Sequence, residues 1–275
     1  MSLVNSVLPA VASLTALGTA FGAFLGVAAR AFKIDGLDER IAAIEAILPG
    51  ANCGACGVSG CSAFAQAVVE GTVPSNGCVV GGDPVAKLIA DILGSAAQPI
   101  ERRTAVVKCQ GSCDHTVPKY TYIGYPDCTA AYSLSGGTKR CTQACLGLGT
   151  CVHACQFNAI RLIDGVAVVD RASCTACGEC TKVCPKGIIA MHRYTCDIDV
   201  LCSNKNEGKK VREVCNVGCI GCGMCMEACK VRAIKMFEYL AVIDTEVCIN
   251  CYACVQKCPT KSIARLHDSK RLSSE

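Results

Sequence analysis

The sequence predicts an α+β protein with three parts: a single N-terminal transmembrane helix, a small mainly helical cysteine module, and two tandem related units. Three observations lead to this prediction. Residues 7–29 form an uncharged, largely apolar stretch of 23 residues. Cysteine makes up 26 of the 275 residues, far above its ordinary usage. Nine of these cysteines recur at a fixed spacing later in the chain, which indicates an internal duplication.

The cysteine pattern and the composition exclude two broad classes of protein. Disulfide-rich secreted proteins are usually short, and they do not usually gather their cysteines in C-x2-C-x2-C runs as this chain does. Intrinsic disorder is excluded because 51% of the residues are hydrophobic and only 18% are charged. We therefore expect reduced thiols, on the cytosolic side of a membrane.

The apolar stretch and its flanks form the first part, residues 1–30. A helix over residues 7–29 would be about 34 Å long, enough to cross a bilayer. Arg30 and Lys33 follow directly, so the rest of the chain is expected on the cytoplasmic side. A cleaved signal peptide is the alternative, but the sequence lacks the basic segment that begins such peptides.

The second part, residues 31–98, combines a helix with a compact set of cysteines. Asp38–Leu48 has apolar residues at helical spacing and ends at Pro49-Gly50. A C-x2-C-x4-C run and one later cysteine follow: Cys53, Cys56, Cys61 and Cys78. Four converging thiolates suit a [4Fe-4S] cluster. Zinc is the alternative, but a zinc ribbon would be expected to have two paired C-x2-C knuckles.

The remainder of the chain is a duplication with an offset of 74 residues, which we divide into units at residues 99–192 and 193–275. The strand-like segment Ala167–Asp170 matches Ala241–Asp244 at this offset. The matching cysteines are Cys128, Cys141, Cys145, Cys151, Cys155, Cys174, Cys177, Cys180 and Cys184 with Cys202, Cys215, Cys219, Cys225, Cys229, Cys248, Cys251, Cys254 and Cys258.

Three runs in these units, beginning at Cys174, Cys219 and Cys248, have the bacterial ferredoxin form. In such runs three cysteines bind one cluster and the fourth binds its neighbour. This exchange predicts three [4Fe-4S] sites: Cys219, Cys222, Cys225 with Cys258; Cys248, Cys251, Cys254 with Cys229; and Cys174, Cys177, Cys180 with Cys155. The units are therefore expected to be bacterial-ferredoxin-like.

A further run in the first unit is irregular, because Leu148 stands where the offset predicts a cysteine. We expect Cys141 to replace the missing ligand. The resulting fourth site of the two units is Cys141, Cys145, Cys151 and Cys184.

Six cysteines then remain, and four of them could hold a sixth cluster between the units. We choose Cys109, Cys128, Cys202 and Cys215, which leaves Cys113 and Cys196 as free thiols. The offset offers a rival grouping of Cys128 and Cys141 with Cys202 and Cys215, which would move Cys109 to the irregular site. Alternatively, all six are buried small hydrophobic residues. The first grouping gives about six [4Fe-4S] clusters in total.

Charge and motifs limit the remaining functions. The formal net charge is +4, but each oxidised cluster with its thiolates adds about −2, so the loaded chain is acidic and no nucleic-acid partner is expected. The glycine-rich dinucleotide fingerprint between a strand and a helix is missing, so neither NAD nor flavin is expected on this chain. We expect no catalytic acid, base or nucleophile; the histidines are scattered, at His115, His153, His192 and His267.

Three features together resemble the B subunit of the Rnf complex, a membrane-bound, ion-translocating ferredoxin:NAD oxidoreductase. They are the apolar N-terminal helix, the segment LPGANCGACGVSGC with Cys78, and the tandem ferredoxin runs. Tyr125–Cys128 and Cys145–Gly149 resemble the longer members of that family. The resemblance covers essentially the whole chain.

The resemblance implies an electron-transfer subunit of a translocase, with no hydride or substrate site of its own. Reduced ferredoxin would be the donor, and the partners would be integral membrane and flavin-bearing subunits. The implied location is the inner cell membrane, single-pass, with the cluster-bearing units on the cytoplasmic side. The alternatives are a membrane-tethered polyferredoxin that serves another reductase or hydrogenase, and a structural metal-binding scaffold. A basic loop either attracts acidic ferredoxin or is merely solvated: Lys205, Lys209, Lys210 and Arg212.

Overall fold

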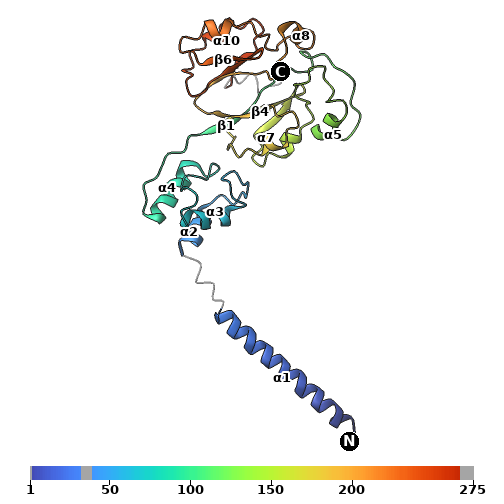
Figure 1. Cartoon of the computed structure of the whole chain (residues 1–275), viewed down its shortest axis with the longest axis vertical. Helices are drawn as coiled ribbons and strands as arrows, with labels where there is room; N and C mark the ends of the chain where they lie inside the picture. Colours follow the sequence, from blue (N-terminus) through green and yellow to red (C-terminus); the bar gives the residue numbers. More distant parts are fainter. Residues whose placement is uncertain (1, 32–38, 267–275) are drawn as a thin grey trace.

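The computed structural model describes residues 2–31 and 39–266 (Figure 1). Helix α1 spans Ser2–Ala31 and includes the whole stretch for which a helix is predicted. None of the helices in the described residues combines the length and the apolar character that a membrane span requires, and the predicted transmembrane segment is not confirmed. Lys33, Asp38 and His267 lie outside the described part of the chain.

The cysteine module is a bundle of three short helices, in agreement with its predicted helical character. The helices are α2 (Glu39–Ile47), α3 (Cys61–Val69) and α4 (Gly82–Leu93). Ile44, Phe64 and Ile89, one from each helix, are almost fully buried in one core. A core of this size contributes little stability by itself, so the loops between the helices depend on what their cysteines bind.

Each of the two larger units combines antiparallel strand pairs with very short helices. The strand pairs are β1 (Arg103–Val107) with β4 (Ile189–Arg193), β2 (Ile160–Ile163) with β3 (Val166–Val169), β5 (Ile198–Val200) with β8 (Ile263–Arg265), and β6 (Ile234–Phe237) with β7 (Leu240–Ile243). The helices are α5 (Cys128–Ser133), α6 (Thr150–His153), α7 (Glu179–Val183), α8 (Gly208–Arg212), α9 (Met224–Glu227) and α10 (Ala253–Lys257). The mixed helix and strand content confirms the α+β prediction.

The backbone repeats at the 74-residue offset, as the sequence does. The strand register Ile160↔Val169 recurs as Ile234↔Ile243. Left-handed residues also recur, at Asn158, Asp164, Ala176 and Gly178 and then at Arg232, Glu238, Asn250 and Tyr252. Such conformations are unfavourable for most side chains, so their recurrence shows that both units use the same turns around their cysteine runs.

One recurring turn requires glycine. Gly147 and Gly221 have φ values of +72° and +66°. A Cβ atom would lie 2.4 Å from the carbonyl oxygen of Gly165 in the first unit and 2.8 Å from that of Tyr239 in the second. Both glycines therefore let the turn of a β-hairpin pack directly on a cysteine run.

The first strands of the two units are equivalent at a different offset. Val107 in β1 pairs with Ile189, and Val200 in β5 pairs with Ile263, the residue equivalent to Ile189. A cysteine follows two residues after each strand, at Cys109 and at Cys202. Cys109, and not Cys128 as the 74-residue offset suggests, is thus the structural equivalent of Cys202.

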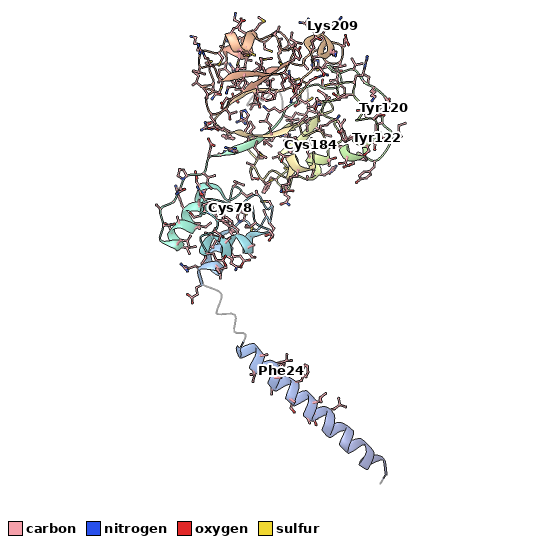
Figure 2. All side chains as sticks on the ribbon, viewed as in Figure 1. Phe24, Cys78, Tyr120, Tyr122, Cys184 and Lys209 are labelled. Carbon is pink, nitrogen blue, oxygen red and sulfur yellow. The ribbon has the colours of Figure 1, made fainter. Side chains whose placement is uncertain are left out.

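The length of the next segment accounts for the change of offset. Cys109 and Cys141 are separated by 31 residues, whereas Cys202 and Cys215 are separated by 12. The first unit therefore contains a longer segment, which carries α5 and reaches the surface with Tyr120 and Tyr122 (Figure 2).

Buried ion pairs join the two units. Asp199 on β5 is fully buried and pairs with Lys108, which follows β1. His192 on β4 lies 3.4 Å from the same carboxylate, measured from Nε2 to Oδ2. Because a buried charge is costly without a partner, these contacts hold the first strand pair of one unit against that of the other.

Candidate metal centres

The first set of thiols lies in the cysteine module and is called group 1. Its members all line one cavity of about 350 Å³: Cys53, Cys56, Cys61 and Cys78. The side chain of Asn52 accepts a hydrogen bond of 2.8 Å from the backbone N–H of Cys61, which closes the loop around the cavity. The Gly81 N–H donates to Cys78 Sγ at 3.4 Å. Burial raises the pKa of Cys78, and the thiols of Cys61 and Cys56 raise it further.

Group 2 lies in the first unit and comprises Cys155, Cys174, Cys177 and Cys180. Burial raises the pKa of Cys180 to about 12, and the other three thiols of the group add to the shift. Backbone N–H groups point at two of the sulfurs, from Ala159 to Cys155 and from Ala105 to Cys174, both at 3.4 Å. The four members are those that the ferredoxin run predicts.

Group 3 is the irregular site, and its composition differs from the prediction. One cavity of about 350 Å³ is lined by Cys128, Cys145, Cys151 and Cys184, without Cys141 (Figure 2 shows Cys184). Burial raises the pKa of Cys151 to about 12, followed by the effects of Cys145, Cys128 and Cys184. The structure thus places Cys128 here, whereas the sequence reasoning placed it in the sixth site.

Cys128 is held in this position by polar residues that the sequence reasoning did not single out. It is the first residue of α5, whose N-cap, Asp127, accepts a hydrogen bond of 2.8 Å from the Ala130 N–H. The Thr150 hydroxyl donates to Asp127 and accepts from the Cys128 N–H at 2.7 Å. Leu148 packs beside Cys128, so α5 brings its thiol to the neighbourhood where the repeat lacks a cysteine.

Group 4 lies between the units and comprises Cys109, Cys141, Cys202 and Cys215. A Cβ atom on Gly111 would lie 3.7 Å from the sulfur of Cys109 and 3.6 Å from that of Cys215. Burial raises the pKa of Cys215, and the thiols of Cys141 and Cys109 raise it further. Burial also raises the pKa of Cys202 to about 12, with a contribution from Cys141.

Asn204 connects the two halves of group 4. This residue is 2% exposed, its side-chain amide donates to Cys141 Sγ, and its backbone N–H donates to Cys202 Sγ, both at 3.4 Å. The group contains the equivalent residues Cys109 and Cys202 together with the equivalent residues Cys141 and Cys215. It therefore differs from both groupings that the sequence suggested, each of which included Cys128.

Groups 5 and 6 lie in the second unit and have the composition that the runs predict. Group 5 lines a cavity of about 310 Å³ and comprises Cys219, Cys222, Cys225 and Cys258. Group 6 is Cys229, Cys248, Cys251 and Cys254; burial raises the pKa of Cys254 to about 11, with contributions from Cys248 and Cys251. Cys229 belongs to the same core and accepts a hydrogen bond of 3.3 Å from the Ala233 N–H.

Cys258 differs electrostatically from the other buried thiols. Burial alone would raise its pKa, but hydrogen bonds from Ser262, Ile263 and Thr260 outweigh that effect and lower the pKa. The sulfur lies 3.3 Å from the Ser262 hydroxyl and 3.8 Å from the Thr260 hydroxyl. Hydrogen bonds to a ligand sulfur change the potential of the centre it binds, so group 5 is tuned differently from group 6.

Two cysteines belong to none of the six groups, as the sequence predicts. Cys113 is exposed, whereas Cys196 is 2% exposed and lies next to Cys248. Within residues 2–31 and 39–266, no three side chains of His, Cys, Asp or Glu form a set that could hold a single metal ion.

The six groups form an unbranched series, because each has a thiol beside one of the next group. The neighbouring pairs are Cys53 and Cys177, Cys180 and Cys151, Cys145 and Cys109, Cys202 and Cys219, and Cys225 and Cys254. The order along this series is group 1, 2, 3, 4, 5 and 6. It starts in the small module and ends in the second unit.

The donor sets fit iron–sulfur clusters. Iron–sulfur clusters are held by thiolates, and each group supplies four sulfurs. Thiols with a pKa near 12 are protonated at neutral pH, so binding requires a metal charge strong enough to displace those protons and to compensate for burial. The N–H groups that point at the sulfurs would stabilise the thiolates and adjust the potential of each centre.

Models of known protein families match three parts of the chain. Residues 48–80 match "Putative Fe-S cluster", residues 166–189 match "4Fe-4S binding domain", and residues 218–262 match "4Fe-4S dicluster domain". These ranges contain group 1, part of group 2 and most of groups 5 and 6.

Several curated proteins are similar along nearly the whole chain. The B subunit of the "Ion-translocating oxidoreductase complex" of Methanosarcina acetivorans is 45% identical, over 95% of this chain and 97% of its own length. The B subunits of the "Na(+)-translocating ferredoxin:NAD(+) oxidoreductase complex" of Acetobacterium woodii and the "Proton-translocating ferredoxin:NAD(+) oxidoreductase complex" of Clostridium ljungdahlii are each 40% identical. Those two alignments cover 95% and 94% of this chain and 79% and 93% of the relatives.

Proposed function

The chain belongs to the family of B subunits of ion-translocating oxidoreductase (Rnf) complexes, and on this premise we propose that its six thiol groups relay electrons from reduced ferredoxin to membrane partner subunits. The chain is an electron-transfer subunit of an ion-translocating ferredoxin:NAD oxidoreductase. Hydride transfer to NAD, and any flavin, belong to other subunits of the complex.

Each thiol group is proposed to hold one [4Fe-4S] cluster, which supplies one-electron transfer. The 24 ligands are the same cysteines that the sequence singles out. Their grouping follows the structure: Cys128 belongs to group 3, and Cys141 belongs to group 4. Six clusters, rather than five, follow from the four converging sulfurs of group 4.

The single observation that carries the relay is the unbranched series of groups. Electrons that enter at group 6 have one path, through groups 5, 4, 3 and 2, to group 1. This direction is supported by the ends of the series, because Cys251 of group 6 is exposed to solvent and group 1 follows α1 in the chain.

We propose that α1 holds the chain at the cell membrane beside integral subunits, as a single helix with the thiol groups on the cytoplasmic side. The large side chains of residues 14–27 are apolar and exposed, and Leu14, Phe21, Phe24 and Val27 are each at least 64% exposed (Figure 2 shows Phe24). A helix with apolar side chains on all its faces needs lipid or protein around it.

Breaking the series at its centre tests the relay. In the full-length Cys215→Ala variant, group 4 loses a ligand, and reduced ferredoxin should still reduce groups 5 and 6 rapidly. Groups 1, 2 and 3 should remain oxidised, so about two of the five remaining clusters bleach quickly in visible absorption. Dithionite should reduce all five. Rapid reduction of all five by ferredoxin would contradict the unbranched order.

A further inference from the structure

Equivalent loops of the two units have the same backbone but different surroundings. Residues 172–178 carry two thiols of group 2, and residues 246–252 carry two thiols of group 6. The left-handed residues Ala176 and Asn250 occupy the same place, with φ of 60° and 55°. Whatever binds one loop therefore meets a similar main-chain shape on the other.

In the first unit this loop is covered by the chain's own cysteine module. Burial raises the pKa of Cys177, and the thiol of Cys53 from the module contributes to the shift. The segment 79–84 of the module and the segment 172–176 line one cavity from opposite sides. The hydroxyl oxygen of Thr175 is buried there. This loop is thus a docking surface for a small thiol-bearing module.

In the second unit the equivalent loop is bare and apolar. Ile249, the counterpart of Thr175, is 63% exposed, and Val247 is 45% exposed. Cys251, the counterpart of Cys177, is exposed as well. An exposed apolar patch beside a thiol group indicates a surface that another protein covers.

Charge indicates what kind of protein fits this surface. The module that covers the first loop is acidic, with five Asp and Glu against two Lys and Arg over residues 39–98. The second unit has ten Lys and Arg against six Asp and Glu over residues 200–266, and Lys257 is exposed in the helix that follows the loop. A small acidic electron carrier would be attracted to it.

We propose that residues 246–252, centred on Ile249, form the surface on which reduced ferredoxin docks. This inference rests on the proposed function and places the donor at the end of the series. In each encounter one electron leaves the reduced iron–sulfur centre of ferredoxin and reduces the centre held by group 6, and no bond or proton is exchanged. The exposed apolar patch is small, which suits a carrier that must leave again after each transfer.

The test uses the full-length, cluster-loaded chain in detergent and measures its reduction by reduced ferredoxin in a stopped-flow experiment. Ile249→Glu and Val247→Glu should each slow this reduction by about tenfold, because a charge is placed at the centre of an apolar contact. Iron content and the rate of reduction by dithionite should be unchanged. Ile123→Glu is the matched control, since Ile123 is 94% exposed in the other unit and its change should have no effect.

Two results would overturn the docking surface alone. One is reduction of both loop variants at the wild-type rate. The other is a large loss of rate in a Lys209→Glu, Lys210→Glu variant of α8 while the Ile249→Glu variant is unaffected, which would place ferredoxin on α8 instead. If ferredoxin does not reduce the wild type although dithionite does, the proposed function fails, and the docking surface fails with it.

Discussion

The two ferredoxin-like units have the same backbone but complete their ligand sets differently. In the second unit, Cys222 lies within its run and is a member of group 5. In the first unit the equivalent position is Leu148, and the fourth thiol of group 3 comes from Cys128, on a segment that the second unit lacks. A ligand is therefore defined by where the fold brings its sulfur, and not by its register in the repeat.

The comparison also explains the site between the units. Cys109 and Cys141 from the first unit meet Cys202 and Cys215 from the second, and the two pairs occupy equivalent places at the ends of the first strands and after the variable segment. Asn204 holds a thiol from each pair. Duplication thus produced a site that neither unit contains alone.

The difference between Leu148 and Cys222 can be broken most directly at Cys128. The Cys128→Ser variant should lose group 3 as a four-thiolate site, and with it about four iron atoms per chain. Transfer from ferredoxin to groups 2 and 1 should stop, because the series has no second path. Adding Leu148→Cys to this variant should restore iron, since it recreates the arrangement of the second unit.

Cys113 provides the control, because it lies in the same segment and is exposed. Cys113→Ser should retain all its iron by chemical assay. If Cys128→Ser retained it too, Cys128 would have no part in group 3.

The pairing of thiols in group 4 can be sharpened with a double variant. Cys109→Ser and Cys141→Ser should each remove about four iron atoms, and together they should remove about four rather than about eight, because both belong to one site. Iron analysis and the visible spectrum measure this. A loss of about eight would place Cys141 with Cys145, Cys151 and Cys184 instead.

The contact that holds the units together predicts a smaller effect, on stability. Lys108→Met leaves the carboxylate of Asp199 buried without its ion pair, and should lower the free energy of unfolding by about 2 kcal/mol. Anaerobic denaturant unfolding, followed by circular dichroism, measures the change. Lys182→Met removes an exposed pair with Glu179 and should have little effect. Equal effects of the two variants would contradict a special role for the junction.

The smallest predicted effect is the pH dependence of the same junction. Burial lowers the pKa of His192 below its ordinary value of 6.5, and Asp199 offsets only part of this shift. The unfolded chain therefore takes up a proton below about pH 6.5 that the folded chain does not, and stability falls as the pH is lowered.

His192→Asn should reduce this loss, by at most about 1.4 kcal/mol for each unit by which the pKa is lowered. The measurement is the free energy of unfolding of both proteins between about pH 7 and about pH 5. Identical slopes would show that His192 takes up its proton equally in both states.

The sequence predicts much of this architecture, because ferredoxin runs carry their own ligand rule. Groups 1, 2, 5 and 6 have the expected members, and the hairpins recur at the expected offset. Exchange of Cys128 and Cys141 was not predictable from that offset, because a segment of different length precedes Cys141. The apolar strand followed by a cysteine, Ala105–Cys109 and Ile198–Cys202, is the signal that would have related Cys109 to Cys202. Polar residues such as Asn204 and Thr150 carry no such signal, since only the fold brings them to a sulfur.

The central claim is that six thiol groups form one unbranched relay, and an electron count tests it most directly. The full-length chain, loaded with iron and sulfide under anaerobic conditions, would be titrated with reduced ferredoxin and followed by visible absorption. The expected uptake is about six electrons per chain, one for each group. An uptake of about five, with group 4 left without a cluster, would contradict the relay, because the first unit would then have no connection to the second.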